Sequence, residues 1–387
     1  MPEGPPRKKV VVLGSTGSIG ESSLKVARDL PDRIELIGLA ANRSVDSLAD
    51  QLNEFGIQQG CLYDPTGLSH LKTKVDDSVT LHAGEEGLIE LATLPEADIV
   101  LIAIVGVAGL RPALAAIEAG KDIAVASKEI LVMAGEQVMN AAREKGVKIL
   151  PVDSEHNAIF QCLEGKPASD VSRLILTASG GPFRELPSSE LSDVTVARAL
   201  KHPTWEMGQK ISIDSATLFN KGLEMIEARW LFDIEMERVD VIVHPQSIVH
   251  SMVEFIDGSI LAQLSTTDMC FPIQYAITWP ERVPNTLTPL DFAELAKLDF
   301  ERPRYEDFPA LNLAKEAGTT GGTLPAVLNA ANEVAVSTFL SGNLSFPGIW
   351  KTVETVMSNH EVAEHPTLET LIDADLWARE EAKRIIS

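Results

Sequence analysis

A glycine-rich turn between an apolar run and a helical pattern restricts the fold more than any other feature. Residues 10–13 are Val-Val-Val-Leu, and Gly14, Gly17 and Gly20 follow at once. Short β-branched runs are typical of buried parallel strands. Glycines at this spacing let the chain turn tightly into a helix whose N-terminus can face an anion. Although the spacing is GxxGxxG rather than GxGxxG, the strand–turn–helix context predicts a dinucleotide-binding turn. The alternative is a glycine-rich turn without a ligand.

Strand and helix patterns alternate over about the first 150 residues, which predicts a Rossmann-like doubly wound parallel sheet in an α/β protein. From Arg173 onward the pattern changes to strands with turn signals and helices, which predicts a second, α+β domain. The remainder is rich in Ala, Leu and Glu and is expected to be helical. We therefore expect four parts, namely an N-terminal domain (1–152), a central α+β domain (153–280), a proline-rich linker (281–305) and a C-terminal helical domain (306–387).

Composition excludes several classes of partner and location. The 33 Lys and Arg residues against 56 Asp and Glu give a net charge of −23, so the surface repels nucleic-acid backbones. The three cysteines form no CxxC pair, which fits a reducing cytoplasm. Residues 1–9 lack the apolar core of a signal peptide, and the longest apolar run, near 99–110, contains glycines and is too short for a membrane span. We expect a cytoplasmic protein with no nucleic-acid or membrane partner.

The end of the second predicted strand indicates which dinucleotide is bound. NAD enzymes place an Asp or Glu there to hold the ribose 2′-hydroxyl. Here Ala40 is followed by Ala41, Asn42, Arg43 and Ser44, without an acidic residue. Arg43 could pair with a 2′-phosphate, which favours NADPH. Alternatively, Arg43 is a solvated cation of a loop.

Two carboxylates follow the predicted strand at 148–152. If the segment is extended, Asp153 and Glu155 point to the same side. A divalent cation would relieve the repulsion between them, and oxygen ligands suit Mg²⁺ or Mn²⁺. His156 is expected to point away from the pair and to be structural. The alternative for the pair is a solvated acidic turn.

A second polar pattern lies in residues 214–232, which we predict to form one long amphipathic helix. Asp214 and Ser215 are residue types that cap helix N-termini. Asn220, Lys221 and Glu224 are three or four residues apart, so they share one face. Such a face can bind a phosphate, a hydroxyl and a metal together. A surface helix with a Lys–Glu pair is the alternative.

Other polar segments are candidates for ligand contacts. The turn that begins at Ser179 could form a backbone nest for a phosphate. Residues 202–208, His-Pro-Thr-Trp-Glu-Met-Gly, could close over a ligand. Lys128 follows a predicted strand and could reach a substrate oxygen. The roles of His244 and His250 are ambiguous, and a structural role is favoured for His244. Each of these segments could equally be an ordinary turn or surface feature.

Taken together, eight segments resemble one family, the 1-deoxy-D-xylulose 5-phosphate reductoisomerases. The resemblance runs from about residue 8 to the C-terminal helices. Two positions depart from the expected pattern: Ala41 stands where Lys is frequent, and Ser127 where Asn is frequent. The segments that carry the resemblance are Gly14–Gly20, Ala126–Glu129, Pro151–Asn157, Ala178–Arg184, His202–Gly208, Lys210–Thr217, Asn220–Glu224 and His244–Ser247.

The resemblance implies a reaction and its cofactors. Enzymes of this family rearrange the carbon skeleton of 1-deoxy-D-xylulose 5-phosphate and reduce the product with NADPH to 2-C-methyl-D-erythritol 4-phosphate, an isoprenoid precursor. The implied metal is Mg²⁺, Mn²⁺ or Co²⁺. A homodimer formed through the central domain is also implied. The N-terminal domain would then bind NADPH and the central domain the metal and the substrate.

The resemblance also assigns roles to residues of this chain. The implied metal ligands are Asp153, Glu155 and Glu224. The implied substrate contacts are Lys128, Ser154, Glu155, Ser179, His202, Ser215, Asn220, Lys221 and Glu224. Catalytic roles among these are implied for Lys128, Glu155, His202 and Lys221. The implied or inferred cofactor contacts are Gly14, Thr16, Gly17, Ser18, Ile19, Ala40, Asn42, Arg43, Ser127, Glu129 and Gly208.

Two other functions fit parts of the sequence. A semialdehyde dehydrogenase would share the first domain, but none of the cysteines lies in a polar, glycine-flanked turn beside a histidine, as a thiolate nucleophile requires. The second is a catalytically silent NADPH-binding sensor. It would bind NADPH but show no metal-dependent turnover.

Overall fold

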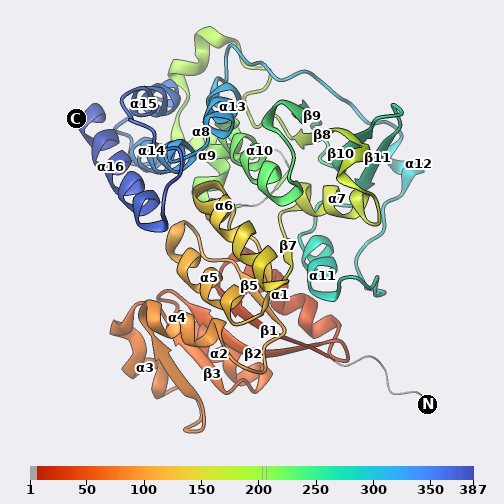
Figure 1. Ribbon diagram of the computed structural model, residues 1–387, viewed down its shortest axis with the longest axis vertical. Coiled ribbons are helices and arrows are strands. Elements are labelled where there is room, and N and C mark those ends of the chain that lie inside the picture. The colour runs from red at the N-terminus through yellow and green to blue at the C-terminus, as the bar shows by residue number, and fades with distance from the viewer. Residues whose placement is uncertain (1–6, 203, 206) are drawn as a thin grey trace. The chain divides into compact units, whose positions relative to one another are not determined.

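The computed structural model describes residues 7–202, 204–205 and 207–387 and divides into two compact units (Figure 1). Each unit is assembled from several stretches of chain. The first unit comprises residues 1–130, 136–157 and 268–288. The second comprises residues 131–135, 158–267 and 289–387. Within the described residues, the structure contains no helix that combines the length and the apolar character needed to cross a membrane.

The first unit is built on a seven-stranded sheet in the order β4-β3-β2-β1-β5-β6-β7. All neighbouring strands are parallel. The β-branched and leucine residues 10–13 are fully buried at its centre, as expected for a sheet covered on both faces. This confirms the predicted Rossmann-like sheet. The strands are β1 (Lys8–Leu13), β2 (Ile34–Ala41), β3 (Gln59–Leu62), β4 (Thr80–Ala83), β5 (Ile99–Ile102), β6 (Asp122–Val125) and β7 (Ile149–Pro151).

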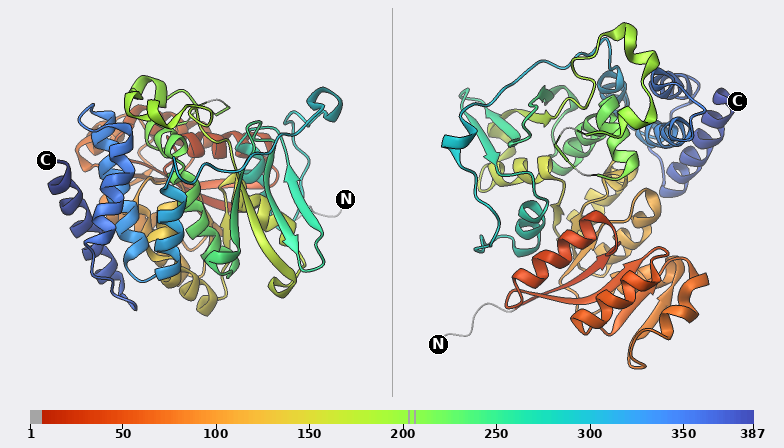
Figure 2. Two further views of the ribbon diagram at one scale, coloured as in Figure 1. Left: turned by 90° about the horizontal axis from the view of Figure 1, so that it is seen from above. Right: turned by 180° about the vertical axis from the view of Figure 1, so that it is seen from behind.

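Helices connect these strands, and the right-hand view of Figure 2 shows them beside the sheet. One comes from far along the chain, since α11 packs against α1 and β7. Helix α6 contains a non-helical residue, Ala134 (φ −135°, ψ 34°). The helices are α1 (Ser18–Asp29), α2 (Val45–Phe55), α3 (Leu68–Lys72), α4 (Gly84–Ala92), α5 (Leu110–Glu118), α6 (Lys128–Lys145), α7 (Ser154–Leu163) and α11 (Cys270–Thr278), with 3₁₀ turns at Pro65–Gly67 and Val107–Gly109.

The second unit contains a four-stranded sheet in the order β11-β10-β8-β9. Strands β8 and β9 are parallel, and β10 is antiparallel to both of its neighbours. Helix α10 packs on β8 and β9. The predicted α+β domain is therefore present. The strands are β8 (Val171–Ala178), β9 (Val239–Val243), β10 (Val249–Phe255) and β11 (Ile260–Leu264), with 3₁₀ turns at Ala168–Asp170, Ser188–Asp193 and Met236–Arg238.

Helix α14 packs against α13, α15 and α16, which Figure 1 labels around it. Edge-to-face aromatic contacts stabilise the core around these helices. The ring centres of Phe183 and Phe346 lie 5.2 Å apart, and those of Phe346 and Trp350 lie 5.4 Å apart. The predicted helical C-terminus is confirmed. The helices of this unit are α8 (Val196–Ala199), α9 (Gln209–Thr217), α10 (Phe219–Phe232), α12 (Phe292–Leu295), α13 (Ala310–Thr320), α14 (Leu324–Leu340), α15 (Phe346–Ser358) and α16 (Leu368–Ile386).

The prediction of one long helix over residues 214–232 is wrong. Two helices, α9 and α10, meet at Leu218, which has a left-handed backbone with φ of 65°. Leu218 is buried, so its packing holds a conformation that its own backbone disfavours. Asp214 and Ser215 consequently lie in the last turns of α9 and do not cap the start of a helix.

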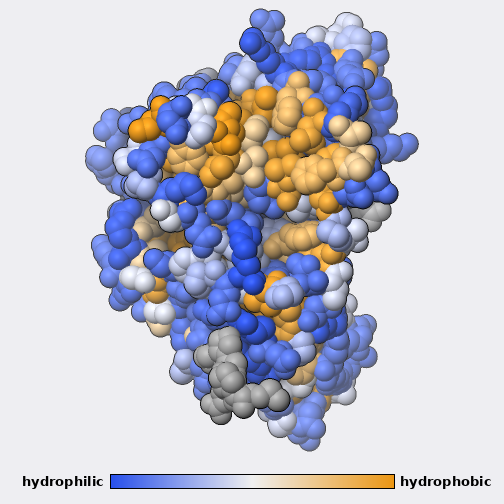
Figure 3. All heavy atoms as spheres, turned by 90° about the vertical axis from the view of Figure 1, so that its right-hand side faces the viewer, coloured by the Kyte–Doolittle hydropathy of each residue, from blue (hydrophilic) through white to orange (hydrophobic). Residues whose placement is uncertain are grey.

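Strand β11 is the exposed edge of the second sheet. Ile260 and Leu261 on this strand are 49% and 41% exposed, and the nearby Ile256 is 71% exposed. Figure 3 shows a broad apolar area on the side of the molecule where Figure 1 draws β11. Exposed apolar edge strands are uncommon in proteins that stay monomeric.

Candidate active site

The glycine turn after β1 has the geometry that the motif predicts. Gly14 has φ of 98°, and a Cβ atom at this position would lie 2.5 Å from the carbonyl oxygen of Ala103. Only glycine fits there. The backbone N–H groups of Gly14 and Ser15 donate to the carbonyl oxygen of Ala40 over 2.9 and 2.8 Å. The turn is thereby held between the carboxyl ends of β1, β2 and β5.

The residues predicted to contact a dinucleotide lie at the start of α1 and the end of β2. Gly17 precedes the first helical residue, Ser18, and both are exposed. Helix N-termini of this kind favour anions. Arg43 lies after β2 with its side chain 80% exposed, and its Nε donates to Asp64 over 2.7 Å. Asp64 follows β3 and had no signal in the sequence.

A second group of predicted residues follows β6. Ser127 Oγ donates to the carbonyl oxygen of Ile104 over 2.5 Å and lies 3.2 Å from Glu129 Oε2. Lys128 Nζ forms an ion pair of 2.8 Å with Asp153 Oδ2, and both side chains are largely buried. The structure thus brings Lys128 next to one of the two carboxylates predicted to bind metal.

The expectation of an extended segment at Asp153–Glu155 is wrong, because helix α7 begins at Ser154. Asp153 precedes that helix, and its Oδ1 accepts a hydrogen bond from the backbone N–H of Glu155 over 3.3 Å, as N-terminal aspartates do. The two side chains still converge, because their carboxylate oxygens lie within 4.8 Å of each other. Ser154 Oγ is hydrogen-bonded to Glu155.

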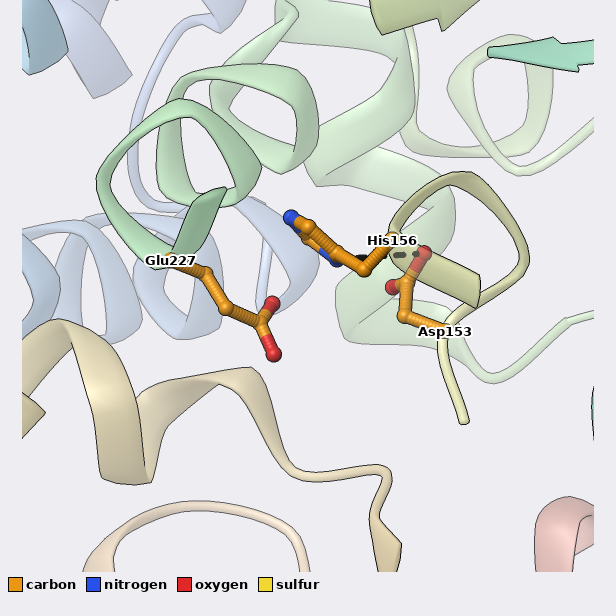
Figure 4. A group of neighbouring side chains, drawn as sticks. All are labelled: Asp153, His156 and Glu227. Atoms are coloured by element: carbon orange, nitrogen blue, oxygen red, sulfur yellow. Dashed lines mark ion pairs between the residues drawn. The ribbon is translucent and has the colours of Figure 1, made fainter. Parts of the chain in front are cut away.

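His156 does not point away from the acidic pair, as the sequence had led us to expect. It lies one helical turn after Asp153, with Nδ1 3.8 Å from Asp153 Oδ1 (Figure 4). Its side chain has no exposed surface. The helical rather than extended backbone explains the difference, because residues three apart share one face of a helix.

His202 joins two serines of the second unit. Its Nε2 lies 3.0 Å from both Ser179 Oγ and Ser215 Oγ. Ser179 follows β8 and Ser215 lies on α9. These backbones approach closely, because a Cβ on Gly181 would be 2.8 Å from the carbonyl oxygen of Ser215, and Gly181 has φ of 68°. Three residues predicted to bind substrate are therefore in contact.

The hydrogen bonds of His202 show which ring nitrogen carries the proton. The backbone N–H groups of Trp205 and Thr204 donate to Nδ1 over 2.9 and 3.2 Å. Since an N–H can only donate, Nδ1 carries no proton, and the neutral ring is protonated at Nε2. Burial lowers the pKa of His202 from 6.5 to about 4. Nε2 therefore carries the single ring hydrogen, which the two serine oxygens share as acceptors, and both hydroxyl hydrogens are left to donate to a ligand.

Asn220, Lys221 and Glu224 meet on the first turns of α10. Asn220 Nδ2 donates to Glu224 Oε1 over 2.5 Å, and Lys221 forms an ion pair with the same carboxylate. The Lys221 and Glu224 side chains are 4% and 1% exposed. A surface Lys–Glu pair is therefore excluded, since both charges are buried and must compensate each other.

One histidine near this group had been left open by the sequence. His250 is buried on β10, with Nε2 2.9 Å from Ser265 Oγ. Burial lowers its pKa to about 4, and the nearby Lys221 charge acts in the same direction. Gly208 precedes α9, whereas Pro203 and Glu206 of the predicted closing loop lie outside the described residues.

Three family models match the chain. The models describe 1-deoxy-D-xylulose 5-phosphate reductoisomerase over residues 10–135, its C-terminal domain over residues 149–232, and a DXP reductoisomerase C-terminal domain over residues 264–381. Among curated proteins, the reductoisomerases of Pelotomaculum thermopropionicum and Geobacter metallireducens are each 51% identical to this chain. Both alignments cover 98% of it, and they cover 98% and 99% of the relatives.

Solved structures agree with this similarity. A reductoisomerase from Zymomonas mobilis in complex with NADPH superposes with a TM-score of 0.93 at 47% identity, covering 98% of this chain and 99% of that one. A DOX-P reductoisomerase in complex with NADPH, fosmidomycin and magnesium gives a TM-score of 0.91 at 40% identity, covering 98% of each chain. The chain belongs to the 1-deoxy-D-xylulose 5-phosphate reductoisomerase family.

Proposed function

We propose that this protein converts 1-deoxy-D-xylulose 5-phosphate to 2-C-methyl-D-erythritol 4-phosphate with NADPH and a divalent metal ion. The observation that carries the proposal is the identity of about half of all positions to curated reductoisomerases over nearly the whole chain. The buried polar groups described above supply the chemistry, and the product is a precursor for isoprenoids.

The donor set in the first unit fits a divalent cation. Asp153 and Glu155 place carboxylate oxygens within 4.8 Å of each other, and all-oxygen ligands suit Mg²⁺ or Mn²⁺. Glu224 of the second unit is proposed as the third ligand. When bound, the cation acts as a Lewis acid on the ketone and the neighbouring hydroxyl of the substrate. Lys128 pairs with Asp153 at 2.8 Å and so orients that carboxylate.

The phosphate of the substrate is proposed to bind in the second unit. Ser179 and Ser215 accept from His202 and so present their hydroxyl hydrogens as donors. Lys221 and Asn220 add a cation and an amide from α10. This arrangement offers a phosphate several donors in a protein whose net charge is −23. A phosphate anchored away from the reacting carbons holds the carbon skeleton in register for the rearrangement.

NADPH supplies the hydride for the reduction, and the first unit is proposed to hold it. The turn at Gly14–Gly17 and the N-terminus of α1 receive the pyrophosphate. Arg43 and Asn42 lie after β2, where a 2′-phosphate would be placed. Arg43 is exposed but already pairs with Asp64, which restrains its guanidinium near that position.

The reading as a silent NADPH-binding sensor is not favoured. The relatives that match along the whole chain are reductoisomerases. The chain also retains three carboxylates, Lys221 and Ser215, which a sensor that only binds NADPH does not require.

A homodimer and a cytoplasmic location complete the proposal. The exposed apolar edge formed by Ile260 and Leu261 on β11 supports a second copy as the partner of this sheet. The three cysteines are buried and form no disulfide within the described residues, which supports a reducing compartment.

The test is the absorbance of NADPH in the presence of purified protein, 1-deoxy-D-xylulose 5-phosphate and Mn²⁺. We expect loss of absorbance that requires the substrate and stops when the metal is chelated. Binding of NADPH without any substrate-dependent oxidation, with metal present, would refute the enzyme and favour the sensor.

A further inference from the structure

A buried polar contact connects the C-terminal helices to the proposed phosphate site. Asp214 on α9 and Asn332 on α14 are 118 positions apart, and Asn332 Nδ2 donates to Asp214 Oδ1 over 2.8 Å. The exposed fraction is 1% for Asp214 and 0% for Asn332. Nothing in the proposed reaction uses either residue.

We propose that Asn332 is a positioning residue. By donating a hydrogen bond from α14 to Asp214 on α9, it fixes the positions of Ser215 and His202. The proposal rests on the function proposed above, because it concerns how the phosphate group of that substrate is bound. Asn332 itself touches neither the substrate nor the reacting atoms.

The buried carboxylate of Asp214 has a hydrogen-bond partner on each of its oxygens. A buried carboxylate needs donors on both oxygens, since burying a charge without partners is costly. Lys210 Nζ meets Oδ2 at 2.6 Å from the same helix, and Asn332 meets Oδ1. A carboxylate only accepts, so the amide of Asn332 must turn its nitrogen toward Asp214.

Asn332 lies among apolar residues in its own helix, α14. Its neighbours Ala330, Ala331, Ala335 and Val336 are all buried and apolar. An asparagine in such a helix gains nothing from packing and is a weak helix former. Its Oδ1 is buried and has no hydrogen-bond partner in the described part of the chain. The side chain is therefore placed for its single donor bond to α9.

Asp214 is connected to the proposed phosphate site through its own helix, α9. Ser215 is the next residue of the same helix, and its Oγ shares His202 Nε2 with Ser179. The helix also has little freedom at Ser215, because Gly181 approaches the backbone of Ser215 too closely for a Cβ. A small shift of α9 would thus change the distances from His202 to both serines.

Asn329 provides a matched control. It lies one turn earlier on α14, is also 0% exposed, and donates over 3.0 Å to Glu333 of the same helix rather than to α9. Replacing either asparagine removes a buried amide from α14. Only replacement of Asn332 removes the bond to the phosphate site.

The experiment compares Asn332→Leu, Asn332→Ser and Asn329→Leu in the full chain, after wild-type turnover has been established. For both Asn332 variants we expect KM for the sugar phosphate, and Ki for inorganic phosphate as a competitor, to rise together by about three- to tenfold. kcat should stay within about twofold, because the reacting atoms are not touched. Asn329→Leu should lower the melting temperature and leave KM and Ki unchanged.

Two outcomes would overturn the inference. One is an unchanged KM and Ki in a folded Asn332 variant. The other is an equal rise of KM in Asn329→Leu, which would indicate a general loss of packing. Asn332→Ser decides the question if the leucine variant does not fold. An inactive wild-type protein would instead refute the proposed function, so the two failures are distinguishable.

Discussion

The buried carboxylate of Glu224 combines two observed contacts with a proposed metal-binding role. It accepts from Asn220, pairs with Lys221 and is the proposed third metal ligand, while only 1% of its side chain is exposed. Glutamine has the same shape but lacks the charge, and its single amide oxygen can accept from only one of Asn220 and Lys221. Glu224→Gln therefore tests the metal role through the loss of an anionic ligand.

For Glu224→Gln we expect the Mn²⁺ concentration needed for half-maximal activity to rise by about 100-fold, because an anionic ligand is lost. NADPH oxidation at several metal concentrations measures it. The control is Glu235→Gln, an exposed position after the same helix, which should behave as wild type. An unchanged metal requirement in Glu224→Gln would remove Glu224 from the ligand set.

His250 makes the stability of the fold depend on pH. Its pKa is lowered from 6.5 to about 4 by burial and by the charge of Lys221. The unfolded chain therefore binds a proton before the folded protein does, and the free energy of unfolding falls as pH drops from about 6.5 to about 4. The shift corresponds to about 3 kcal/mol over that range.

We expect His250→Gln to flatten this dependence, because glutamine keeps a polar atom near Ser265 and does not titrate. Urea unfolding at a series of pH values gives the slope. His70→Gln, at an exposed position, is the control that should keep the wild-type slope. A His250→Gln slope equal to that of wild type would show that other groups dominate.

Local motifs predicted many of the residue types that surround the proposed chemistry, but not their partners. Lys221 and Glu224 are recognisable because they are three residues apart on one helix. Asp64, His250 and Asn332 carried no such signal, since their partners lie on other elements. Hydrogen bonds between distant segments depend on packing, which one sequence does not reveal.

At the scale of elements, the turn after β1 is the most constrained connection. Gly14→Ala would force a Cβ to within 2.5 Å of a backbone oxygen at φ of 98°, so the turn must shift. We expect NADPH affinity to fall by at least about tenfold, measured by fluorescence titration or calorimetry.

Gly56 is the matched control for that substitution. It also has a left-handed backbone, with φ of 64°, but an added Cβ would meet nothing within 4 Å. Gly56→Ala should therefore cost about 1 kcal/mol of stability with NADPH affinity unchanged. Equal losses of affinity in both variants would mean that the turn geometry does not determine binding.

Two elements were mispredicted, and each has its own physical reason. Helical periodicity continues through Leu218, so the sequence predicted one helix where the chain bends into two. At Asp153 the run of polar residues hid the start of α7. Tertiary packing determines the backbone conformation at Leu218, and a capping side chain determines it at Asp153. The periodicity of the sequence reveals neither effect.

At the scale of the whole molecule, the edge of the second sheet predicts association. Ile260→Lys places a charge on β11, where the wild-type side chain is 49% exposed. We expect the variant to sediment as a monomer and the wild type as a dimer. Ser259→Lys, just before the same strand, is the control and should remain dimeric. A wild-type monomer at micromolar concentration would refute the proposed dimer.

The alternation of strands and helices correctly predicted the parallel sheet, and the Ala-, Leu- and Glu-rich composition correctly predicted the helical C-terminus. It could not reveal that residues 268–288 return to the first unit, where α11 packs against α1. That segment has no periodicity that distinguishes it from its neighbours. Its destination depends on the apolar surface that α1 leaves for it.

The return of this segment has a consequence for synthesis. A ribosome has to make all residues through 288 before the first unit has every piece of its own structure. Until then the surface of α1 that receives α11 has no cover. For the same reason the first unit cannot be excised as one continuous fragment or grafted onto another protein by a single cut. Gene fusions must carry both halves.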